Sequence, residues 1–435
     1  MDMIILASLL IFTLLIFSGV PIALGFLGAT VFVAVTKDYD PDFLLPAGFA
    51  AFNSVTLLTL PFFIAVGYLV TAGSVASRLI NLADAVFGRV RGGLGIVAIV
   101  VSCVFGAISG AAASSVIAIG TTMIPQMEKQ GYPRGYSAAL ISSAAVLATM
   151  IPPSLAMIMF AFVTGQSVAA CFLATVGPAI VLATLFSLLN VVMVRRMPGV
   201  ISPKPMSFKG IAHDLRDRTK PAIGAIMLPV VILGGIYGGI MTPTEAAAVA
   251  VFYVIFLSLV VYRDMSLRQM VIALRASVAS TGTMIVMTFF AALLGRLYTM
   301  EQVPNQVSDM LLSLSSDPLV LLLLINLLLI ITGMVMDELS AILLVTPLLF
   351  PVVLQLGVHP IQFAAIIGTN LGMGMMTPPM AGIMYVGARV GRVTIDKMIG
   401  TSMILILFGS IPVILLVTFW PPLSLALPQL LGVVR

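Results

Sequence analysis

The residues best suited to bind ions or small anions lie in two apolar stretches, each followed by two adjacent prolines. The polar residues are Ser109, Ser114 and Ser115 in the first stretch, and Asp337 and Ser340 in the second. Because glycine and proline interrupt both stretches, helices should break there and leave backbone groups without helical partners. Such groups are tolerated in lipid only where they line a cavity. Helix N-termini suit an anion, and freed carbonyls suit a small cation such as sodium.

The candidate ligands form two groups. The predicted sodium ligands supply hydroxyl, carboxylate or freed backbone oxygens: Ser109, Gly110, Ser114, Thr149, Pro152, Gly333, Asp337, Thr377 and Pro378. The predicted contacts to an anionic substrate are Ser115, Pro153, Ser154, Ser340, Asn370 and Pro379. Together they predict a cation pocket in each half of the chain with an anion between them. Sodium is expected as a coupling ion, and no cofactor is expected.

Asp337 is the most informative single residue, because a carboxylate inside an apolar run is expensive in a membrane and is functional by default. It would ligate sodium or carry a proton, unless it only caps the following helix. The adjacent Glu338 points elsewhere on a helix and is the weaker candidate. Arg296 is expected to extend toward water, with a contact to a partner or substrate as the alternative.

The two stretches are copies of each other at a constant spacing. Five landmark pairs lie 226 positions apart: Pro125 and Pro351, Gly131 and Gly357, Pro152 and Pro378, Pro153 and Pro379, and Gly165 and Gly391. Interrupted apolar segments at matching positions in two halves are the best sequence indication of a transporter's central site. Chance similarity between apolar segments is the competing explanation.

Composition places the chain in a membrane. It has 435 residues, of which 60% are hydrophobic and only 9% charged, whereas soluble domains carry about 25% charged residues. Its Lys and Arg flank apolar segments and form no stripe, so no nucleic-acid partner is expected. His213 and His359 are not placed to activate a nucleophile, and we expect no enzymatic activity.

With about 20 residues per crossing, nine segments are predicted to cross: 4–33, 54–72, 136–165, 169–194, 222–240, 244–262, 277–298, 361–390 and 398–420. The runs 94–127 and 318–353 are too long for one crossing and too short for two, so we interpret each as a re-entrant hairpin. Five crossings separate them, which turns the second copy upside down. The predicted fold is therefore an all-α polytopic membrane protein with an inverted repeat, two re-entrant hairpins and two broken transmembrane helices.

Basic loops orient this layout. The positive-inside rule places the N-terminus in the cytoplasm, the C-terminus in the periplasm, and the loop holding Glu301 outside. Segments 71–92 and 263–277 mix Arg with apolar residues and are predicted to be interfacial arms. The predicted division is 1–93 (first scaffold spans and arm), 94–194 (first hairpin, broken helix and span), 195–221 (cytoplasmic linker), 222–317 (linking span, second scaffold and arm) and 318–435 (second hairpin, broken helix and last span).

Over nearly its whole length the chain resembles the large membrane subunit of tripartite ATP-independent periplasmic (TRAP) transporters, the DctM family. The similarity is carried by Phe105-Gly-Ala-Ile-Ser-Gly110, Gly131-Tyr-Pro133, Ile151-Pro-Pro-Ser154, Thr242-Pro-Thr-Glu-Ala246, Gly333-Met-Val-Met-Asp337 and Thr377-Pro-Pro379. One departure is Ala111-Ala112-Ala113, where family members often carry more hydroxyls.

The resemblance implies an importer in the bacterial inner membrane that uses a sodium gradient to take up an organic anion, a carboxylate or sulfonate. It also implies two partners, a periplasmic substrate-binding protein and a separate four-helix membrane subunit, and an elevator-type movement. A stand-alone sodium/dicarboxylate symporter or an ion antiporter is the alternative. A passive channel is a further one.

Overall fold

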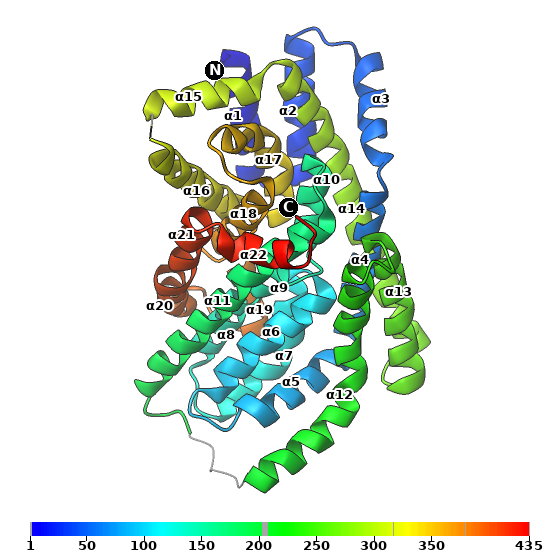
Figure 1. Cartoon of the computed structure of the whole chain (residues 1–435), viewed down its shortest axis with the longest axis vertical. Coiled ribbons are helices and arrows are strands. Elements are labelled where there is room, and N and C mark those ends of the chain that lie inside the picture. The colour runs from blue at the N-terminus through cyan, green and yellow to red at the C-terminus, as the bar shows by residue number, and fades with distance from the viewer. Residues whose placement is uncertain (1, 202–207, 316, 379, 435) are drawn as a thin grey trace.

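The computed structural model describes residues 2–201, 208–315, 317–378 and 380–434, and these residues form helices joined by short turns (Figure 1). The first half contains α1 (Met3–Phe17), α2 (Ile22–Thr36), α3 (Pro41–Phe52), α4 (Val55–Ala72), α5 (Val75–Phe87), α6 (Gly93–Ser109), α7 (Ala112–Lys129), α8 (Arg134–Ala144), α9 (Leu147–Met150), α10 (Leu155–Thr164) and α11 (Val168–Arg195).

The second half contains α12 (Phe208–Tyr237), α13 (Pro243–Phe256) with a π-helical turn (Leu257–Val261), α14 (Leu267–Met300), α15 (Val303–Leu314), α16 (Pro318–Val335), α17 (Glu338–Gln355), α18 (Pro360–Met375), α19 (Gly382–Gly391), α20 (Asp396–Leu405) with a second π-helical turn (Ile406–Ser410), α21 (Ile411–Phe419) and α22 (Pro422–Leu430). Eight of the described helices are long and apolar enough to cross a membrane. The predicted class, an all-α polytopic membrane protein, is confirmed.

The predicted single crossing over residues 4–33 is wrong. Two helices, α1 and α2, occupy this segment and pack against each other. Gly19 adopts φ +84° just after α1, and Pro21 is the N-cap of α2. A left-handed glycine followed by a proline ends one helix and starts the next, and the continuous apolar composition conceals this turn.

The α1–α2 pair brings the N-terminus to the face that holds Glu301. The Lys37 ammonium contacts the Asp2 carboxylate at 2.6 Å and the Glu301 carboxylate at 2.8 Å, and the Tyr39 hydroxyl donates to Glu301 at 2.6 Å. The predicted layout puts the N-terminus and Glu301 on opposite sides, and in this respect it is wrong.

Removing the Glu301 charge should loosen this corner of the protein. Hydrogen bonding to Lys37 lowers the pKa of both the Asp2 and Glu301 carboxyls. Their contribution to stability is therefore present above the ordinary carboxyl pKa of about 4 and lost as pH falls through the lowered folded-state values. We expect Glu301→Gln at neutral pH to increase amide hydrogen exchange around Lys37 and in the first turn of α1, measured by mass spectrometry. Asp309→Asn, on an exposed site of α15, is the control, and unchanged exchange in the Glu301 variant would contradict the prediction.

The second predicted arm is also wrong. Residues 267–277 form the first turns of α14, which continues unbroken to Met300. The separate short helix that follows is α15, which begins 228 positions after α5. The prediction failed because Arg268 and Arg275, among apolar residues, make the first turns of the long helix α14 resemble an amphipathic interfacial segment. The predicted linker 195–221 is likewise partly helical, since α12 begins at Phe208.

The helices α6 to α10 and α16 to α19 follow the 226-residue spacing closely. The helices α7 and α17 are both 18 residues long, and their first residues, Ala112 and Glu338, lie 226 positions apart. Two residues, Gly110 and Ala111, join α6 to α7, and two residues, Met336 and Asp337, join α16 to α17. A 42° bend separates α8–α9 from α10, and residues 376–381 separate α18 from α19.

Packing between the halves is reciprocal. The helix α10 packs against α17, and their counterparts 226 residues away, α19 and α7, also pack against each other. The same holds for α4 with α13 and for α14 with α2. This is the contact pattern that a two-fold relation between the halves would produce. The breaks in both halves are thereby held close to the middle of the molecule (Figure 1).

Candidate functional site

The turn between α6 and α7 lies directly against the first pair of prolines. The Gly110 backbone adopts φ +60°, and a Cβ atom added there would lie 2.6 Å from the carbonyl oxygen of Pro153. The Gly110 carbonyl accepts a hydrogen bond from the N–H of Leu155 at 3.4 Å. Only glycine suits this position, because it allows both the left-handed conformation and the close approach. The structure therefore brings together the turn and the break that the sequence singled out separately.

Two predicted serines beside this turn have unsatisfied hydroxyls. Ser109 and Ser115 are 1% and 0% exposed, and neither Oγ atom has a hydrogen-bond partner among the described residues. Buried hydroxyls are normally paired, so each unpaired one calls for an explanation. A bound cation that accepts oxygen ligands would provide one.

The other predicted residues of the first half have local partners. The Ser114 hydroxyl donates to the Ala111 carbonyl at 2.9 Å, and the Thr149 hydroxyl donates to the Val146 carbonyl at 3.0 Å. Ser154 is the N-cap of α10 and accepts from the Met157 N–H at 3.3 Å. Pro152 and Pro153 are buried beside it. A hydroxyl that donates to a carbonyl still has lone pairs for a cation, so these residues remain available as ligands.

In the second half, α16 and α18 touch through their backbones. A Cβ atom added at Gly333 would lie 2.8 Å from the Leu371 carbonyl oxygen, and one added at Gly374 would lie 2.6 Å from the Gly333 Cα. The first half makes the corresponding contact, since a Cβ at Gly106 would lie 2.3 Å from the Ala148 Cα. Ala148 and Gly374 are 226 positions apart. Small residues thus let the paired elements of each half approach closely.

Asp337 is exposed and serves as the N-cap of α17. Its carboxylate accepts from the N–H groups of Leu339 and Ser340 at 3.2 and 3.3 Å, and from the Ser340 hydroxyl. The buried Ser340 hydroxyl also lies 2.8 Å from the Met287 sulfur on α14. Capping accounts for an acid at this position, and a role as a cation ligand stays a prediction.

The second break lies between α18 and α19, and its predicted ligands form a less complete site than those at the first break. The Thr377 hydroxyl donates to the Met373 carbonyl at 2.7 Å, and Thr377 and Pro378 are half-buried. Pro379 lies outside the described residues. The buried Asn370 donates to Asn326 on α16 at 2.8 Å, within a polar cluster that Thr418 completes. Asn370 therefore contacts α16 rather than the turn at Asp337, and its Oδ1 atom has no partner among the described residues.

Glu338 is the residue that sequence reasoning undervalued. Its side chain is only 4% exposed, and its Oε1 atom has no hydrogen-bond partner among the described residues. Two consecutive acids in an apolar run were the only sign of this in the sequence. The first, Asp337, caps α17, and the second, Glu338, points inward.

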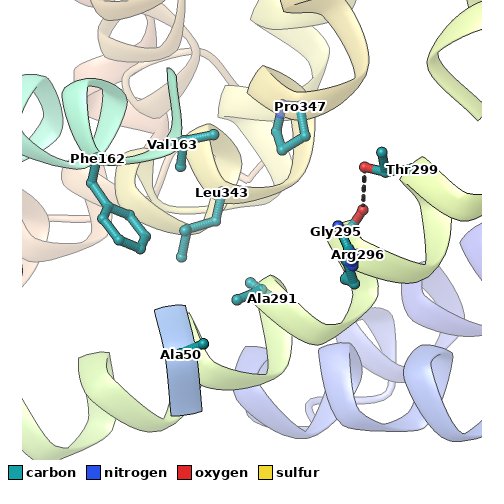
Figure 2. Close-up of a pocket in the computed structure, with 10 residues that line it drawn as sticks. Ala50, Phe162, Val163, Ala291, Gly295, Arg296, Thr299, Leu343 and Pro347 are labelled. Carbon is teal, nitrogen blue, oxygen red and sulfur yellow. Dashed lines mark hydrogen bonds between the residues drawn. The ribbon is translucent and has the colours of Figure 1, made fainter. Parts of the chain in front are cut away.

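A cleft of about 480 Å³ lies between α14 on one side and α10 and α17 on the other (Figure 2). It is lined by Phe162, Val163, Leu343, Pro347, Ala291 and Arg296, among others. Arg296 supplies the positive charge among these lining residues, so it faces the cleft as well as water. A smaller cavity, about 170 Å³, lies between α4, α7 and α10 and includes Ser109 and Ser114. Leu343 and Ile117, 226 positions apart, line the larger and the smaller space.

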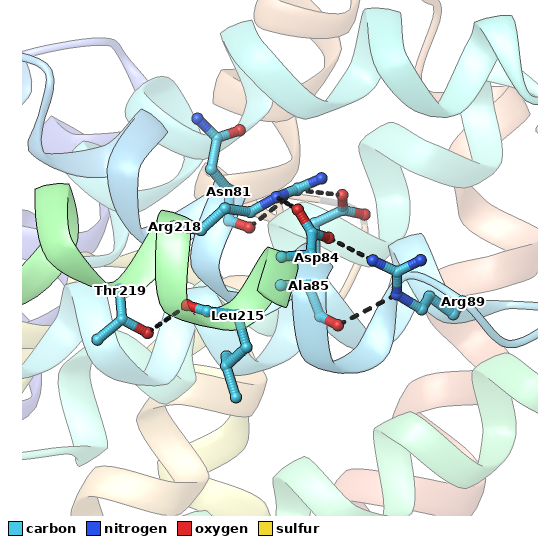
Figure 3. Close-up of polar contacts among 8 residues, drawn as sticks. Asn81, Asp84, Ala85, Arg89, Leu215, Arg218 and Thr219 are labelled. Carbon is cyan, nitrogen blue, oxygen red and sulfur yellow. Dashed lines mark hydrogen bonds and ion pairs between the residues drawn. The ribbon is translucent and has the colours of Figure 1, made fainter. Parts of the chain in front are cut away.

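An ion cluster fixes α5 to α12 (Figure 3). The Arg218 guanidinium contacts Asp84 at 2.8 Å and Asp214 at 2.7 Å, and Arg89 contacts Asp214. Charged networks of this kind restrain orientation better than isolated surface pairs do. Together with Arg78, which lies 3.7 Å above the Tyr262 ring, the cluster ties the short helix α5 to the helices of the second half.

The fold of this chain resembles those of two solved membrane transporters. It resembles the YdaH transporter of Alcanivorax borkumensis (TM-score 0.57, 17% identity, 89% of this chain and 91% of that one). It also resembles MtrF of Neisseria gonorrhoeae, whose structure is described as illuminating antimetabolite efflux pumps (TM-score 0.59, 15% identity, 85% and 81%). At these identities the likeness concerns the fold alone.

The chain belongs to the DctM family: the family profile described as "Tripartite ATP-independent periplasmic transporter, DctM component" matches residues 9–423. It is 35% identical over 414 residues to the C4-dicarboxylate TRAP transporter large permease protein of Pseudomonas aeruginosa, covering 94% of both chains. It is 31% identical over 421 residues to the sialic acid TRAP transporter large permease protein of Vibrio cholerae, covering 96% of both.

A third relative is a longer protein. The chain is 33% identical over 412 residues to the isethionate TRAP transporter permease protein DctMQ of Oleidesulfovibrio alaskensis, covering 94% of this chain but 64% of that relative. The predicted family is confirmed. Its members are transporter permease components, so the chain is a subunit of a TRAP transporter and not an enzyme.

Proposed function

We propose that the chain is the large membrane subunit of a sodium-coupled importer that takes up a small organic anion, a carboxylate or sulfonate. The observation that carries the proposal is the buried, unpaired hydroxyls of Ser109 and Ser115 beside a turn that touches the Pro152-Pro153 break. Helix ends and freed carbonyls at such breaks are suited to bind the ion and the anion. The second half offers the matching set around Gly333, Asp337 and Thr377.

The names of the relatives support an anionic substrate. The three are named for isethionate, C4-dicarboxylate and sialic acid, which are all acids. In this proposal a periplasmic binding protein delivers the substrate, and a small four-helix membrane subunit packs beside this chain as a separate partner. The cleft between α14, α10 and α17, called the Arg296 cleft below, would attract an anion on its way to the binding site. A positive charge between low-dielectric walls focuses the local electric field.

We further propose an inner-membrane orientation that differs from the predicted one at its N-terminus. The basic residues of α5, α12 and the 263–268 segment then lie in the cytoplasm, as do Lys129 and Arg134. Because Asp2 contacts Lys37 beside Glu301, the N-terminus lies on the periplasmic side with Glu301. The C-terminus remains periplasmic.

Unequal clefts support alternating access of the elevator type. The cleft between α14 and α17, which Leu343 lines, has a volume of about 480 Å³. The corresponding cavity between α4 and α7, which Ile117 lines, has a volume of about 170 Å³. A mobile block of the two helix pairs and two broken helices would open one cleft as it closes the other, against α4 and α14 as scaffold. In this proposal the two halves have opposite orientations in the membrane. The same arrangement of helices therefore produces both the outward-open and the inward-open state.

The direct test is uptake into proteoliposomes that contain this chain and its small subunit. Candidate acids are supplied with and without the binding protein, and with and without an inward sodium gradient. Uptake that requires both is the expected result. Uptake that is driven by sodium but needs no binding protein would favour the stand-alone symporter, and uptake indifferent to sodium would refute the coupling.

Ser109→Ala should specifically weaken sodium dependence. Removing one oxygen ligand should raise the sodium concentration for half-maximal uptake by about ten-fold, as losses around metal sites commonly do. The matched control is Ser102→Ala on the same helix, since its buried hydroxyl already donates to the Ala98 carbonyl at 2.8 Å. Equal sodium dependence in the two variants would remove Ser109 from the proposed site.

A further inference from the structure

Two short helices, α5 and α15, called the arm helices below, follow the scaffold helices α4 and α14 after very short joints. Gly73 and Ser74 join α4 to α5. Glu301 and Gln302 join α14 to α15, and Gln302 lies 228 positions after Ser74. The arm helix α5 packs against α6, and α15 packs against α17, so both contact the proposed mobile block. Each joint is therefore a place where the scaffold and the mobile block can turn relative to each other.

At the first joint, the Asp264 carboxylate binds the start of α5 from the loop that precedes α14. It accepts hydrogen bonds from the Ser74 N–H at 3.3 Å and from the Ser74 hydroxyl. The Arg78 guanidinium lies 3.8 Å from the same carboxylate oxygen and donates to the Ser74 hydroxyl oxygen at 2.9 Å. The Asp264 side chain is 17% exposed, so salt and water screen these contacts only partly. A loop of the second half thus holds the first turn of the arm helix in the first half.

The second joint is held in the same way by residues of the first half. The Glu301 carboxylate accepts from the Tyr39 hydroxyl at 2.6 Å and contacts the Lys37 ammonium at 2.8 Å, both from the loop between α2 and α3. The Gln306 side chain on α15 donates to the Glu301 carbonyl at 2.8 Å and accepts from the Asp2 N–H at 2.9 Å. The start of α15 is thereby fixed to the first half of the chain.

The two loops that make these contacts have similar backbones. Asp38, in the loop after α2, and Arg263, in the loop before α14, both have left-handed conformations, φ +56° and +53°, and lie 225 positions apart. The charges are exchanged between the joints, because the acid Asp264 lies in the loop whereas the acid Glu301 lies in the joint itself. The two joints therefore have in common the polar contact to the other half, not the residue types that form it.

We propose that Asp264 and Glu301 are positioning residues for transport, each of which fixes the first turn of an arm helix to the scaffold. The arm helix can then turn about a defined point, and displacement of the mobile block is not lost in movement of the joint. The inference rests on the elevator movement in the proposed function. Neither residue belongs to the predicted ion or substrate ligands, so losing the contact should slow the conformational step and leave ion affinity unchanged.

The test compares Asp264→Ala and Glu301→Ala with the unmodified chain in the proteoliposome assay, with the small subunit and the binding protein present. We expect the maximal uptake rate per folded complex to fall about ten-fold, the factor that corresponds to one charge-assisted hydrogen bond, while the half-saturating sodium concentration stays the same. Asp264→Asn and Glu301→Gln keep an acceptor oxygen and should restore part of the rate. The controls are two exposed acids, Glu128→Ala, which loses a pair with Arg134 at 3.2 Å, and Asp309→Ala on α15.

Each outcome decides the inference. Unchanged maximal rates in both alanine variants would overturn it, as would a lower unfolding temperature with a full rate per folded complex, which indicates a purely structural role. A rise in the half-saturating sodium concentration would also overturn it and would place these residues in ion binding. If an alanine variant does not fold, the asparagine and glutamine variants carry the comparison, because they lose the charge. If the unmodified complex takes up no acid, the proposed function is refuted, and amide hydrogen exchange decides the inference: it must rise in the first turn of α5 in Asp264→Asn.

Discussion

Replacing Gly110 by alanine should abolish transport and lower the unfolding temperature of the complex. A left-handed conformation costs an alanine about 1–2 kcal/mol, and Gly110 has φ +60°. Its new Cβ atom would also lie 2.6 Å from the Pro153 carbonyl oxygen, and overpacking of this kind adds about 1–3 kcal/mol. Because that carbonyl belongs to the break, the displacement would disturb the proposed ion pocket directly. Thermal unfolding and proteoliposome uptake measure the two effects.

Gly165→Ala is the matched control for this experiment. Gly165 also has a left-handed backbone, φ +68°, but a Cβ atom there would meet nothing within 4 Å. The control therefore includes the conformational strain and omits the contact with the break. We expect it to lose some stability and keep its uptake. If both variants retained uptake, the contact between the turn and the Pro152-Pro153 break would not be required for transport.

Filling the Arg296 cleft should stop transport without destabilising the protein. Gly295 lies on α14 and lines the cleft, and a Cβ atom there would meet nothing within 4 Å. Gly295→Leu adds a side chain to the open space and improves the helix propensity of α14 by about 1 kcal/mol. In the elevator proposal α17 must close against α14 in this region. We therefore expect uptake to fall at least ten-fold while the unfolding temperature stays equal or rises.

Gly282→Leu, on the same helix, separates the two effects. Gly282 is exposed, is likewise open around its Cβ position, and does not line the cleft. This control gains the same helix propensity and should keep its uptake. Full uptake by Gly295→Leu would show that the cleft stays open during transport, and the elevator proposal would then lose its main structural support.

Much of the central architecture could be predicted because glycine and proline mark it. The breaks after Ser109 and around Pro152 have direct steric causes, so their positions are visible in the sequence. The 226-residue spacing even gives the start of α17 from the start of α7. These features depend on local backbone chemistry, which one chain segment determines by itself.

Features that depend on neighbours were not predictable in the same way. A uniformly apolar segment does not reveal that α1 and α2 fold back on each other, since both helices have similar composition. The inward orientation of Glu338 and the outward one of Asp337 depend on how α17 packs against α10, and this packing involves residues almost 200 positions apart. The pairing of Asn370 with Asn326 likewise requires the contact between α16 and α18. Local patterns identify the candidates but not the partners.

The reciprocal packing of α10 with α17 and of α7 with α19 has a consequence for how such a chain is assembled. Neither half can bury these surfaces until the other has been synthesised and inserted, so the first half must wait in the bilayer in an incomplete state.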